Sequence, residues 1–306
     1  MMEQAVLENI CRACFGRQPE AVERCAQGIG NYVYRVTCHG VRYSLRCSRE
    51  PGAYDNTIHW LERLASLDIP VPRVLAKGSL KDWEYLVLTW LEGQELGPAY
   101  PSLSPADKEA IAREVEAIQR QVAGLEVPVS PNWRWQDEVY GLLDRAEGLI
   151  SQNGLFDIEK VQRLRELAKM LEDYFSSVEP VAYLDDVTTK NLLVKDGHVS
   201  GVIDVDWMGV GDRLTYMALT RMALLNMGYD DRYAACLLAE YGPDEEQRRA
   251  FAFYTLLYCV DFMGERGTVF CGRRVNADPP VIARLNQLFD RLWEESRDLL
   301  FTRDML

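Results

Sequence analysis

The sequence contains no long apolar run, and basic residues are scarce. No stretch reaches the ~18 to 20 apolar residues that a transmembrane helix needs, and the start, MMEQAVLENICRAC, carries an acid where a signal peptide is positively charged. Lysine and arginine number 34 against 47 acids, a formal net charge of -13. Because a nucleic-acid backbone is bound by a basic face, we expect no nucleic-acid partner. Because the sequence has neither a long apolar run nor a signal peptide, we expect no membrane association and a cytoplasmic location.

Motifs of several enzyme classes are also missing. The three histidines, His39, His59 and His198, fall in turn-like or helical segments and no G-x-S-x-G occurs, which disfavours a serine or cysteine hydrolase. H-R-D, D-F-G and A-P-E are absent, so a protein kinase proper is disfavoured. Cys11 and Cys14 form a C-x-x-C without a second ligand pair, and we interpret the eight cysteines as buried reduced thiols.

The first part of the chain has the pattern of a small sheet. A helix is predicted over residues 2–15, and then VYRVTC and VRYSLRC alternate around a turn at His39 and Gly40, as in a β-hairpin. Apolar residues recur helically over 55–67 until the prolines of DIPVPRV end the helix. The strand WEYLVLTW follows, and a loop rich in glycine and proline begins after it.

Helical patterns dominate the remainder, starting with a cap at Ser104 and a proline at the next position. They cover residues 136–150, 158–176, 214–227, 230–241, 245–264 and 280–299. The exception is 181–206, where short apolar runs surround a Lys195-Asp196-Gly197 turn. With 48% hydrophobic residues the chain can fill such a core. The pattern predicts an α+β fold with a β-rich N-lobe, residues 1–92, and a mainly helical C-lobe, residues 93–306.

The run YLDDVTTKNLLVKDGHVSGVIDVDW carries the most specific chemistry. It presents Asp186, Asn191 five residues later, Asp204 at the end of an apolar stretch, and Asp206. Phosphoryl transfer needs a carboxylate that orients the attacking hydroxyl and oxygen ligands for Mg²⁺, which neutralises charge on the phosphates. These residues supply that set.

This run resembles the aminoglycoside phosphotransferase and choline kinase branch of the protein-kinase-like fold, whose members carry H-G-D-x-x-x-x-N, a hairpin and I-D-x-x-D. The resemblance implies a two-lobed kinase that moves the γ-phosphate of ATP or GTP to a hydroxyl of a small molecule. It implies Asp186 as the base, Asn191 and Asp204 as Mg²⁺ ligands, and Asp206 as an auxiliary acid near the metal.

Two departures from the family pattern leave an alternative open. Leu184 and Asp185 stand in place of the His-Gly, and the helix Glu that holds the basic residue of the N-lobe would fall at Thr57. Glu62 lies more than one turn later, so the sequence names no partner for that basic residue. The alternative is a catalytically weak or inactive kinase-fold module that binds a nucleotide or another ligand.

The nucleotide site is expected mainly in the N-lobe. Gly28 and Gly30, followed by Asn31, would let backbone N–H groups approach phosphate oxygens, although G-x-G also occurs in ordinary hairpin turns. The resemblance places Arg46 beside the α- and β-phosphates. The strand LVLTWLEG resembles the family hinge, whose backbone would bind the nucleotide base at Thr89, Trp90 and Leu91.

The acceptor site is expected in the C-lobe, and acidity near it favours a cationic or neutral hydroxyl compound. Asp212 resembles the family's G-D-P aspartate with Arg213 in place of the proline, and a helix cap is the simpler interpretation. An aromatic group and an acidic pair lie in the region where this family binds its acceptor. Core packing or a solvated surface is the alternative interpretation for each residue. The aromatic residues are Trp133, Trp135 and Tyr140, and the acids are Asp261 and Glu265.

Overall fold

The computed structural model describes residues 4–25, 32–270 and 273–300, which form two compact units. The first contains Met1–Gln94 together with two later segments, Asn191–Lys195 and Val199–Met208. The second contains Glu95–Lys190, Asp196–His198 and Gly209–Leu306. The segments that carry Asn191, Asp204 and Asp206 thus fold with the N-terminal unit, although the boundary expected from composition assigns them to the C-lobe.

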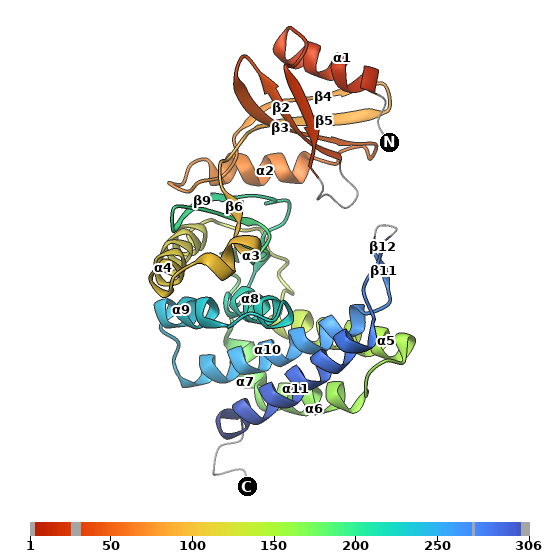
Figure 1. Ribbon diagram of the computed structural model, residues 1–306. Coiled ribbons are helices and arrows are strands. Elements are labelled where there is room, and N and C mark those ends of the chain that lie inside the picture. The colour runs from red at the N-terminus through yellow and green to blue at the C-terminus, as the bar shows by residue number, and fades with distance from the viewer. Residues whose placement is uncertain (1–3, 26–31, 271–272, 301–306) are drawn as a thin grey trace. The chain divides into compact units, whose positions relative to one another are not determined.

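The first unit is built on a five-stranded antiparallel sheet in the order β1-β2-β3-β5-β4 (Figure 1). Its strands are β1 (Ala21–Arg24), β2 (Tyr32–Cys38), β3 (Val41–Ser48), β4 (Val74–Leu80) and β5 (Trp83–Thr89). His39 and Gly40 have φ of 55° and 68°, as the two central residues of a tight β2–β3 hairpin require. The predicted hairpin is therefore present.

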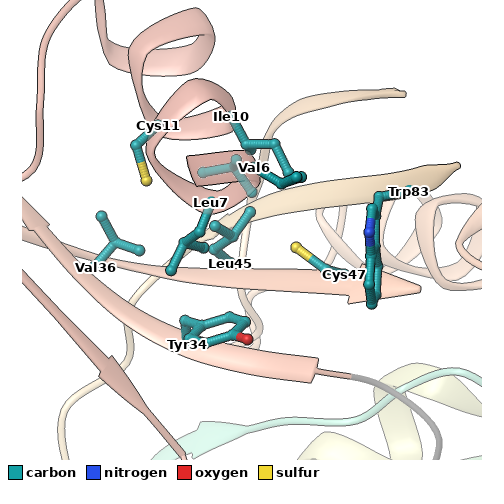
Figure 2. Packing of buried hydrophobic residues seen from close by; sticks show 10 residues of the cluster. Val6, Leu7, Ile10, Cys11, Tyr34, Val36, Leu45, Cys47 and Trp83 are labelled. Carbon is teal, nitrogen blue, oxygen red and sulfur yellow. The ribbon is translucent and has the colours of Figure 1, made fainter. Parts of the chain in front are cut away.

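Two helices cover opposite faces of this sheet, α1 (Gln4–Phe15) and α2 (Asp55–Leu64) (Figure 1). Under α1 the core holds Val6 and Ile10 from the helix against Leu45, Cys47 and Trp83 from the strands, all nearly inaccessible to solvent (Figure 2). Because strand side chains alternate, the residues between these inward positions of β3 point to the other face, where α2 packs.

A small sheet in the order β6-β8-β9 is made of β6 (Gln94–Glu95), β8 (Leu192–Lys195) and β9 (His198–Val202). Asp196 and Gly197, with φ of 52° and 79°, form the predicted turn between β8 and β9. The amide of Val202 donates to the carbonyl of Pro70 over 2.8 Å, which attaches the end of β9 to the loop after α2.

The second unit is mainly helical. Its helices are α3 (Leu96–Ala99), α4 (Pro105–Val122), α5 (Trp135–Asn153), α6 (Glu159–Met170), α7 (Glu172–Ser177), α8 (Leu214–Asn226), α9 (Arg232–Tyr241), α10 (Glu245–Glu265) and α11 (Pro279–Leu300), with a 3-10 turn η1 (Tyr100–Ser102). Two short pairs of strands complete it, β7 (Ala182–Tyr183) with β10 (Gly209–Val210), and β11 (Val269–Phe270) with β12 (Arg273–Arg274). Capping boxes at Ser104 and Asp244 begin α4 and α10.

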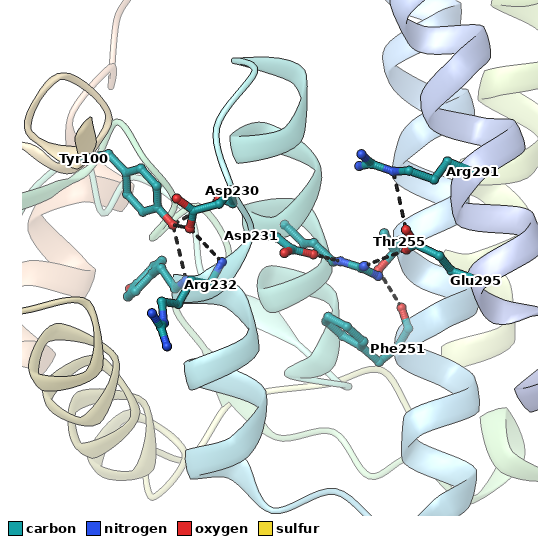
Figure 3. A network of polar contacts seen from close by, with 10 residues as sticks. Tyr100, Asp230, Asp231, Arg232, Phe251, Thr255, Arg291 and Glu295 are labelled. Carbon is teal, nitrogen blue, oxygen red and sulfur yellow. Dashed lines mark hydrogen bonds and ion pairs between the residues drawn. The ribbon is translucent and has the colours of Figure 1, made fainter. Parts of the chain in front are cut away.

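Helix α10 lies at the centre of this unit and packs against α5, α6, α8 and α11. Polar contacts fix the surrounding elements (Figure 3). Arg221 on α8 pairs with Asp231 at 2.7 Å and with Glu295 on α11 at 3.1 Å, while the Tyr100 hydroxyl donates to Asp230 over 2.8 Å. These contacts cross-brace the helices of the second unit.

The expected α+β fold is confirmed, and the differences are local. Strand β4 and the β11–β12 pair were not predicted, and the helix expected over 158–176 is two helices that meet at Leu171. Within the described ranges, no helix is both long and apolar enough to cross a membrane. The seven cysteines of these ranges are free thiols, and Gly28, Gly30, Asn31 and Cys271 lie outside them.

Candidate active site

Arg46 occupies the buried, α2-facing side of β3. Its neighbours Leu45 and Cys47 point into the core under α1, so alternation directs the guanidinium toward α2. The residue is only 8% exposed. A buried arginine needs a paired anion, because an isolated charge away from water is very unfavourable.

That anion is Asp206. Arg46 Nη1 donates to Asp206 Oδ1 over 2.9 Å and Nη2 donates to Oδ2 over 2.6 Å, a two-pronged pair. Asp204 adds a weaker ion pair, with its Oδ1 at 3.4 Å from Nη2. The guanidinium also lies over the ring of Tyr54, 5.6 Å from its centroid. The structure thus names the partner of Arg46 that the sequence left open.

Both members of this pair are charged. Burial on its own lowers the pKa of Arg46, but the hydrogen bonds and charge of Asp206 outweigh it and the net shift is upward. Burial on its own raises the pKa of Asp206, but the hydrogen bonds and charge from Arg46, with a further bond from Thr57, hold it below its ordinary value. The pair therefore stays ionised at neutral pH.

The first turn of α2 holds Asp206 as well. Thr57, which is 1% exposed, donates its hydroxyl to Asp206 Oδ1 over 2.6 Å. The side-chain amide of the preceding residue, Asn56, donates to the backbone carbonyl of Asp206. Adjacent residues of one helix thus bind the side chain and the backbone of the same aspartate.

Asn191 and Asp204 lie on neighbouring backbone segments of the first unit. The amide of Ile203 donates to the carbonyl of Asn191 over 2.9 Å, so the residue after Ile203 starts beside Asn191. Asn191 is 8% exposed, whereas the side chain of Asp204 is 53% exposed. Asp204 has a φ of 60°, a left-handed conformation that is uncommon outside glycine and gathers at functional sites.

The segment with Asp186 belongs to the second unit and follows β7. The side chain of Gln119 on α4 clamps Leu184, because Nε2 donates to its carbonyl and Oε1 accepts from its amide, both over 2.9 Å. Asp186 itself is exposed, and Thr188 donates its hydroxyl to Oδ1 over 3.3 Å. Leu184, two residues before Asp186, is thus held by a fully buried glutamine.

Asp185 and Asp186 lie in different surroundings. Burial, together with the neighbouring charge of Asp186, raises the pKa of Asp185 to about 6. Asp185 is partly buried, and its charge helps to raise the pKa of the buried Tyr183 hydroxyl, whereas Asp186 is exposed to solvent.

Asp212 is a structural residue within the second unit. Its Oδ1 accepts the amide of Leu214 at the start of α8 over 3.0 Å. Its Oδ2 accepts the hydroxyls of Tyr174 and Tyr254 over 2.6 and 3.0 Å. Trp135 donates its indole N–H to the Tyr254 hydroxyl over 2.7 Å. Asp212 and Trp135 therefore connect α5, α7, α8 and α10.

The two acids on α10 differ in their environment. Asp261 is 6% exposed, its Oδ1 has no hydrogen-bond partner among the residues described, and Arg145 on α5 lies 3.5 Å from that oxygen. Burial raises the pKa of Asp261 to about 6, although Arg145 opposes the shift. Glu265, more exposed, pairs with Arg145 at 2.8 Å. Tyr140 donates its hydroxyl to Glu172 over 2.9 Å, and the ring of Trp133 lies against Trp135.

The predicted hinge residues follow the last central strand. Thr89 ends β5, and its hydroxyl accepts the amide of Arg73 over 2.8 Å. Trp90 comes next, with the guanidinium of Arg35 over its ring at 5.7 Å. Leu91 packs beside Gly201. The glycine-containing segment with Gly28, Gly30 and Asn31 lies outside the described residues, and its role stays a prediction.

Comparison with known proteins decides the family. Residues 21–251 match the phosphotransferase enzyme family. The chain belongs to this family. The expectation of a small-molecule kinase, a transferase with a hydroxyl acceptor, is thereby confirmed.

Relatives of this phosphotransferase agree with the assignment. It is 28% identical over 214 residues to an aminoglycoside 3'-phosphotransferase of Streptomyces fradiae, covering 65% of the chain and 75% of that relative. A thermostable mutant of aminoglycoside phosphotransferase APH(4)-Ia, in a ternary complex with ADP and hygromycin B, superposes with a TM-score of 0.65 at 15% identity, over 93% of this chain and 98% of that one. ADP-bound aminoglycoside phosphotransferase APH(2'')-Ib superposes with a TM-score of 0.65 at 13% sequence identity, over 98% of this chain and 100% of that one.

Sequence reasoning missed three supporting residues of this phosphotransferase. Gln119 is fully buried on α4 but looks there like any surface glutamine. Thr57 was noted only as the place of a missing acid. Glu116, 1% exposed, accepts the hydroxyl of Tyr216 and lies 3.7 Å from Arg213, the residue that replaces the family proline. The unusual Arg213 was the only sequence signal for that last contact.

Proposed function

We propose that this phosphotransferase moves the γ-phosphate of ATP or GTP, with Mg²⁺, to a hydroxyl of a small cationic or neutral molecule. The supporting observation is the pair of oxygen donors, Asn191 and Asp204, on hydrogen-bonded backbone segments of the unit that also holds Arg46. Asp186, five residues before Asn191 in the chain, acts as the general base. The hinge and glycine-segment residues named above bind the nucleotide.

The donor set suits Mg²⁺. This ion keeps several waters and takes one or two protein carboxylates together with substrate phosphates. Among the described residues no three His, Cys, Asp or Glu side chains gather as a complete metal site, which is compatible with a metal held largely by the nucleotide and water. Asn191 and Asp204 would hold it, and the metal would neutralise charge developing on the phosphates. The half-exposed side chain of Asp204 supports this role.

Asp186 is preferred to Asp185 as the base. A base must reach the acceptor hydroxyl, and Asp186 is exposed whereas Asp185 is partly buried. An ionised carboxylate orients the hydroxyl and accepts its proton as the phosphoryl group is transferred.

Acidic residues of the second unit and the known relatives support a cationic acceptor. The net charge is -13, and on α10 the carboxylates of Asp261 and Glu265 both pair with Arg145. An amine or ammonium group of the acceptor would share these carboxylates with Arg145. The relative from Streptomyces fradiae is an aminoglycoside 3'-phosphotransferase, and structural neighbours bind hygromycin B, streptomycin and gentamicin. We therefore propose an aminoglycoside-like or other aminated hydroxyl compound.

The test is nucleotide turnover against a library of hydroxyl compounds, with ATP and GTP compared. The wild-type protein should consume nucleotide only when an acceptor and Mg²⁺ are present. Asp186→Asn should reduce kcat by about 10²- to 10⁴-fold while still binding nucleotide. Asp185→Asn is the matched control and should keep most of its activity. Acceptor-independent binding without turnover would favour the inactive kinase-fold module, and a reversed order of the two variants would make Asp185 the base.

A further inference from the structure

We infer that Asp206 positions Arg46 for the nucleotide phosphates, as part of a unit with Thr57, and does not serve as a metal ligand. This inference rests on the proposed function. It concerns the three residues joined by the two-pronged Arg46–Asp206 pair and the Thr57 hydrogen bond. It replaces the expectation that Asp206 is an auxiliary acid of the metal site.

The acceptor sites of Asp206 are largely occupied. Oδ1 receives Arg46 Nη1 and the Thr57 hydroxyl, and Oδ2 receives Arg46 Nη2, so three of about four lone-pair positions are used. The side chain is 26% exposed, against 53% for that of Asp204. Of the two aspartates, Asp206 makes the two-pronged pair with Arg46, and Asp204, whose Oδ1 lies 3.4 Å from Arg46 Nη2, is the more exposed.

The residue at position 57 is compatible with a carboxylate that is supplied by Asp206. The family's helix acid would fall at this position on α2 and would supply a carboxylate to the basic residue of β3. Here the carboxylate comes from Asp206, and a second acid at position 57 would lie beside it and repel it. Threonine instead donates a hydrogen bond to Asp206 over 2.6 Å. In this chain the carboxylate that pairs with Arg46 comes from the segment after β9, and position 57 carries a hydroxyl.

The choice of arginine at position 46 follows from the same geometry. A guanidinium can pair with both oxygens of one carboxylate and still lie over an aromatic ring, which a lysine ammonium cannot do. Arg46 does both, with Asp206 and with Tyr54. The guanidinium has five N–H donors, and the pair with Asp206 uses one on Nη1 and one on Nη2, so further N–H groups on these nitrogens are left for a phosphate. Asp206 thus fixes the direction of the cation.

The first test removes only the Thr57 hydrogen bond. Thr57→Val keeps the volume and deletes the hydroxyl, while Thr57→Ser keeps the hydroxyl and is the matched control. Calorimetry in EDTA, with ADP or GDP according to which the wild type binds, measures phosphate recognition without metal. Thr57→Val should weaken this binding about three- to tenfold and lower kcat/KM for the nucleotide similarly, and Thr57→Ser should restore both. Equal affinities in wild type and Thr57→Val would overturn the inference.

The second test moves the carboxylate. Asp206→Ala should weaken metal-free nucleotide binding about tenfold or more. Thr57→Glu combined with Asp206→Ala should recover much of the loss, and Thr57→Gln combined with Asp206→Ala, which carries no charge, should not. If Asp206 were a metal ligand, Asp206→Ala would change binding only with Mg²⁺ present. Tighter metal-free binding by Asp206→Ala would mean that Asp206 withholds Arg46 from phosphate, and would also overturn the inference.

The outcomes separate this inference from the proposed function. If the Thr57→Glu double variant does not fold, as judged by thermal unfolding, the near-isosteric Thr57→Val and Thr57→Ser pair still decides the matter. A wild-type protein that binds neither nucleotide would refute the proposed function and this inference together. A wild-type protein that binds and transfers, with all Thr57 and Asp206 variants unchanged in metal-free binding, would refute the inference alone.

Discussion

The side chain of Gln119 binds Leu184 at two points, donating to its carbonyl and accepting from its amide over 2.9 Å each. Both groups are buried, and Leu184 lies two residues before the proposed base Asp186. A helix residue thereby sets the backbone position from which the proposed catalytic segment starts. The contact comes from α4, a different element from the segment that it anchors.

Gln119→Leu should therefore reduce both stability and rate. The substitution leaves a buried N–H and a buried C=O without their partners, and we expect the free energy of unfolding to fall by about 2 to 4 kcal/mol. Urea denaturation measures this loss, and kcat should fall as well because the segment with Asp186 loses its anchor. Glu109→Leu, on the exposed side of α4, is the matched control and should change stability by less than about 0.5 kcal/mol. Equal losses in both variants would argue against the clamp.

Asp204→Asn should abolish Mg²⁺-dependent transfer and leave the fold intact. Asparagine keeps the volume and tolerates the left-handed φ of 60°, but it provides a weaker, neutral metal ligand. Asp196→Asn, at the β8–β9 turn with a φ of 52°, is a control matched in residue type and backbone conformation. Activity should be titrated with Mg²⁺ for both. A normal Mg²⁺ dependence in Asp204→Asn would exclude the metal role.

Local patterns predicted much of the fold because turns and helix starts carry their own signals. The pairs His39 and Gly40, and Asp196 and Gly197, marked hairpin turns, and both have the positive φ values that such turns need. Ser104 marked a helix start, and it forms a capping box. Strand β4 escaped prediction because VLAKGSL contains a glycine and a lysine and has no strong β-formers beyond its first two residues.

Local sequence patterns could not predict which side chains contact one another in the site. Arg46 and Asp206 are 160 residues apart, and nothing near either residue indicates the other. Thr57 was read as a missing acid because a family position, and not a three-dimensional neighbour, set the expectation. The charge of a buried residue must be matched by whatever element the fold brings to it. Sequence reasoning can thus propose which residues carry chemistry, but their orienting contacts depend on tertiary structure.

The hydroxyls of Tyr174 and Tyr254 should contribute unequally to stability, although both bind Asp212 Oδ2. Tyr174→Phe removes one hydrogen bond to a carboxylate and should cost about 1 to 2 kcal/mol. Tyr254→Phe also leaves the indole N–H of Trp135 without its acceptor, so about 2 to 4 kcal/mol is expected.

A double-mutant cycle in urea completes this comparison. Within the described chain, the double variant leaves the side chain of Asp212 with only the amide of Leu214 as a hydrogen-bond donor. The loss of stability in the double variant should therefore exceed the sum of the single losses. Tyr140→Phe, which removes a surface hydrogen bond to Glu172, should change stability by less than about 0.5 kcal/mol. A smaller effect for Tyr254→Phe than for Tyr174→Phe would contradict the network.

Asp261→Asn should stabilise the protein at pH 8, with an advantage that disappears on acidification. Burial raises the pKa of Asp261 from an ordinary 3.8 to about 6 in the folded state. Between these two values the folded protein binds more protons than the unfolded chain, so the free energy of unfolding falls as pH rises through this window. The loss of unfolding free energy caused by the ionised Asp261 carboxylate is complete above pH 6 and absent below about pH 4. It is about 1 to 3 kcal/mol, since each pH unit corresponds to about 1.4 kcal/mol and Arg145 remains close by.

The same variant should weaken binding of an aminated acceptor, because it removes the carboxylate proposed to pair with an amine. Urea unfolding of wild type and variant at pH 8 and pH 4 isolates the contribution of Asp261, and acceptor KM measured at pH 8 gives the functional effect. Glu265→Gln is the control: this acid also pairs with Arg145 but is more exposed, so its change should be small at both pH values. A loss of stability in Asp261→Asn at pH 8, or a difference independent of pH, would mean that Arg145 fully compensates the buried charge. Increased stability together with weaker acceptor binding would show that the protein maintains an unfavourable buried carboxylate for its substrate.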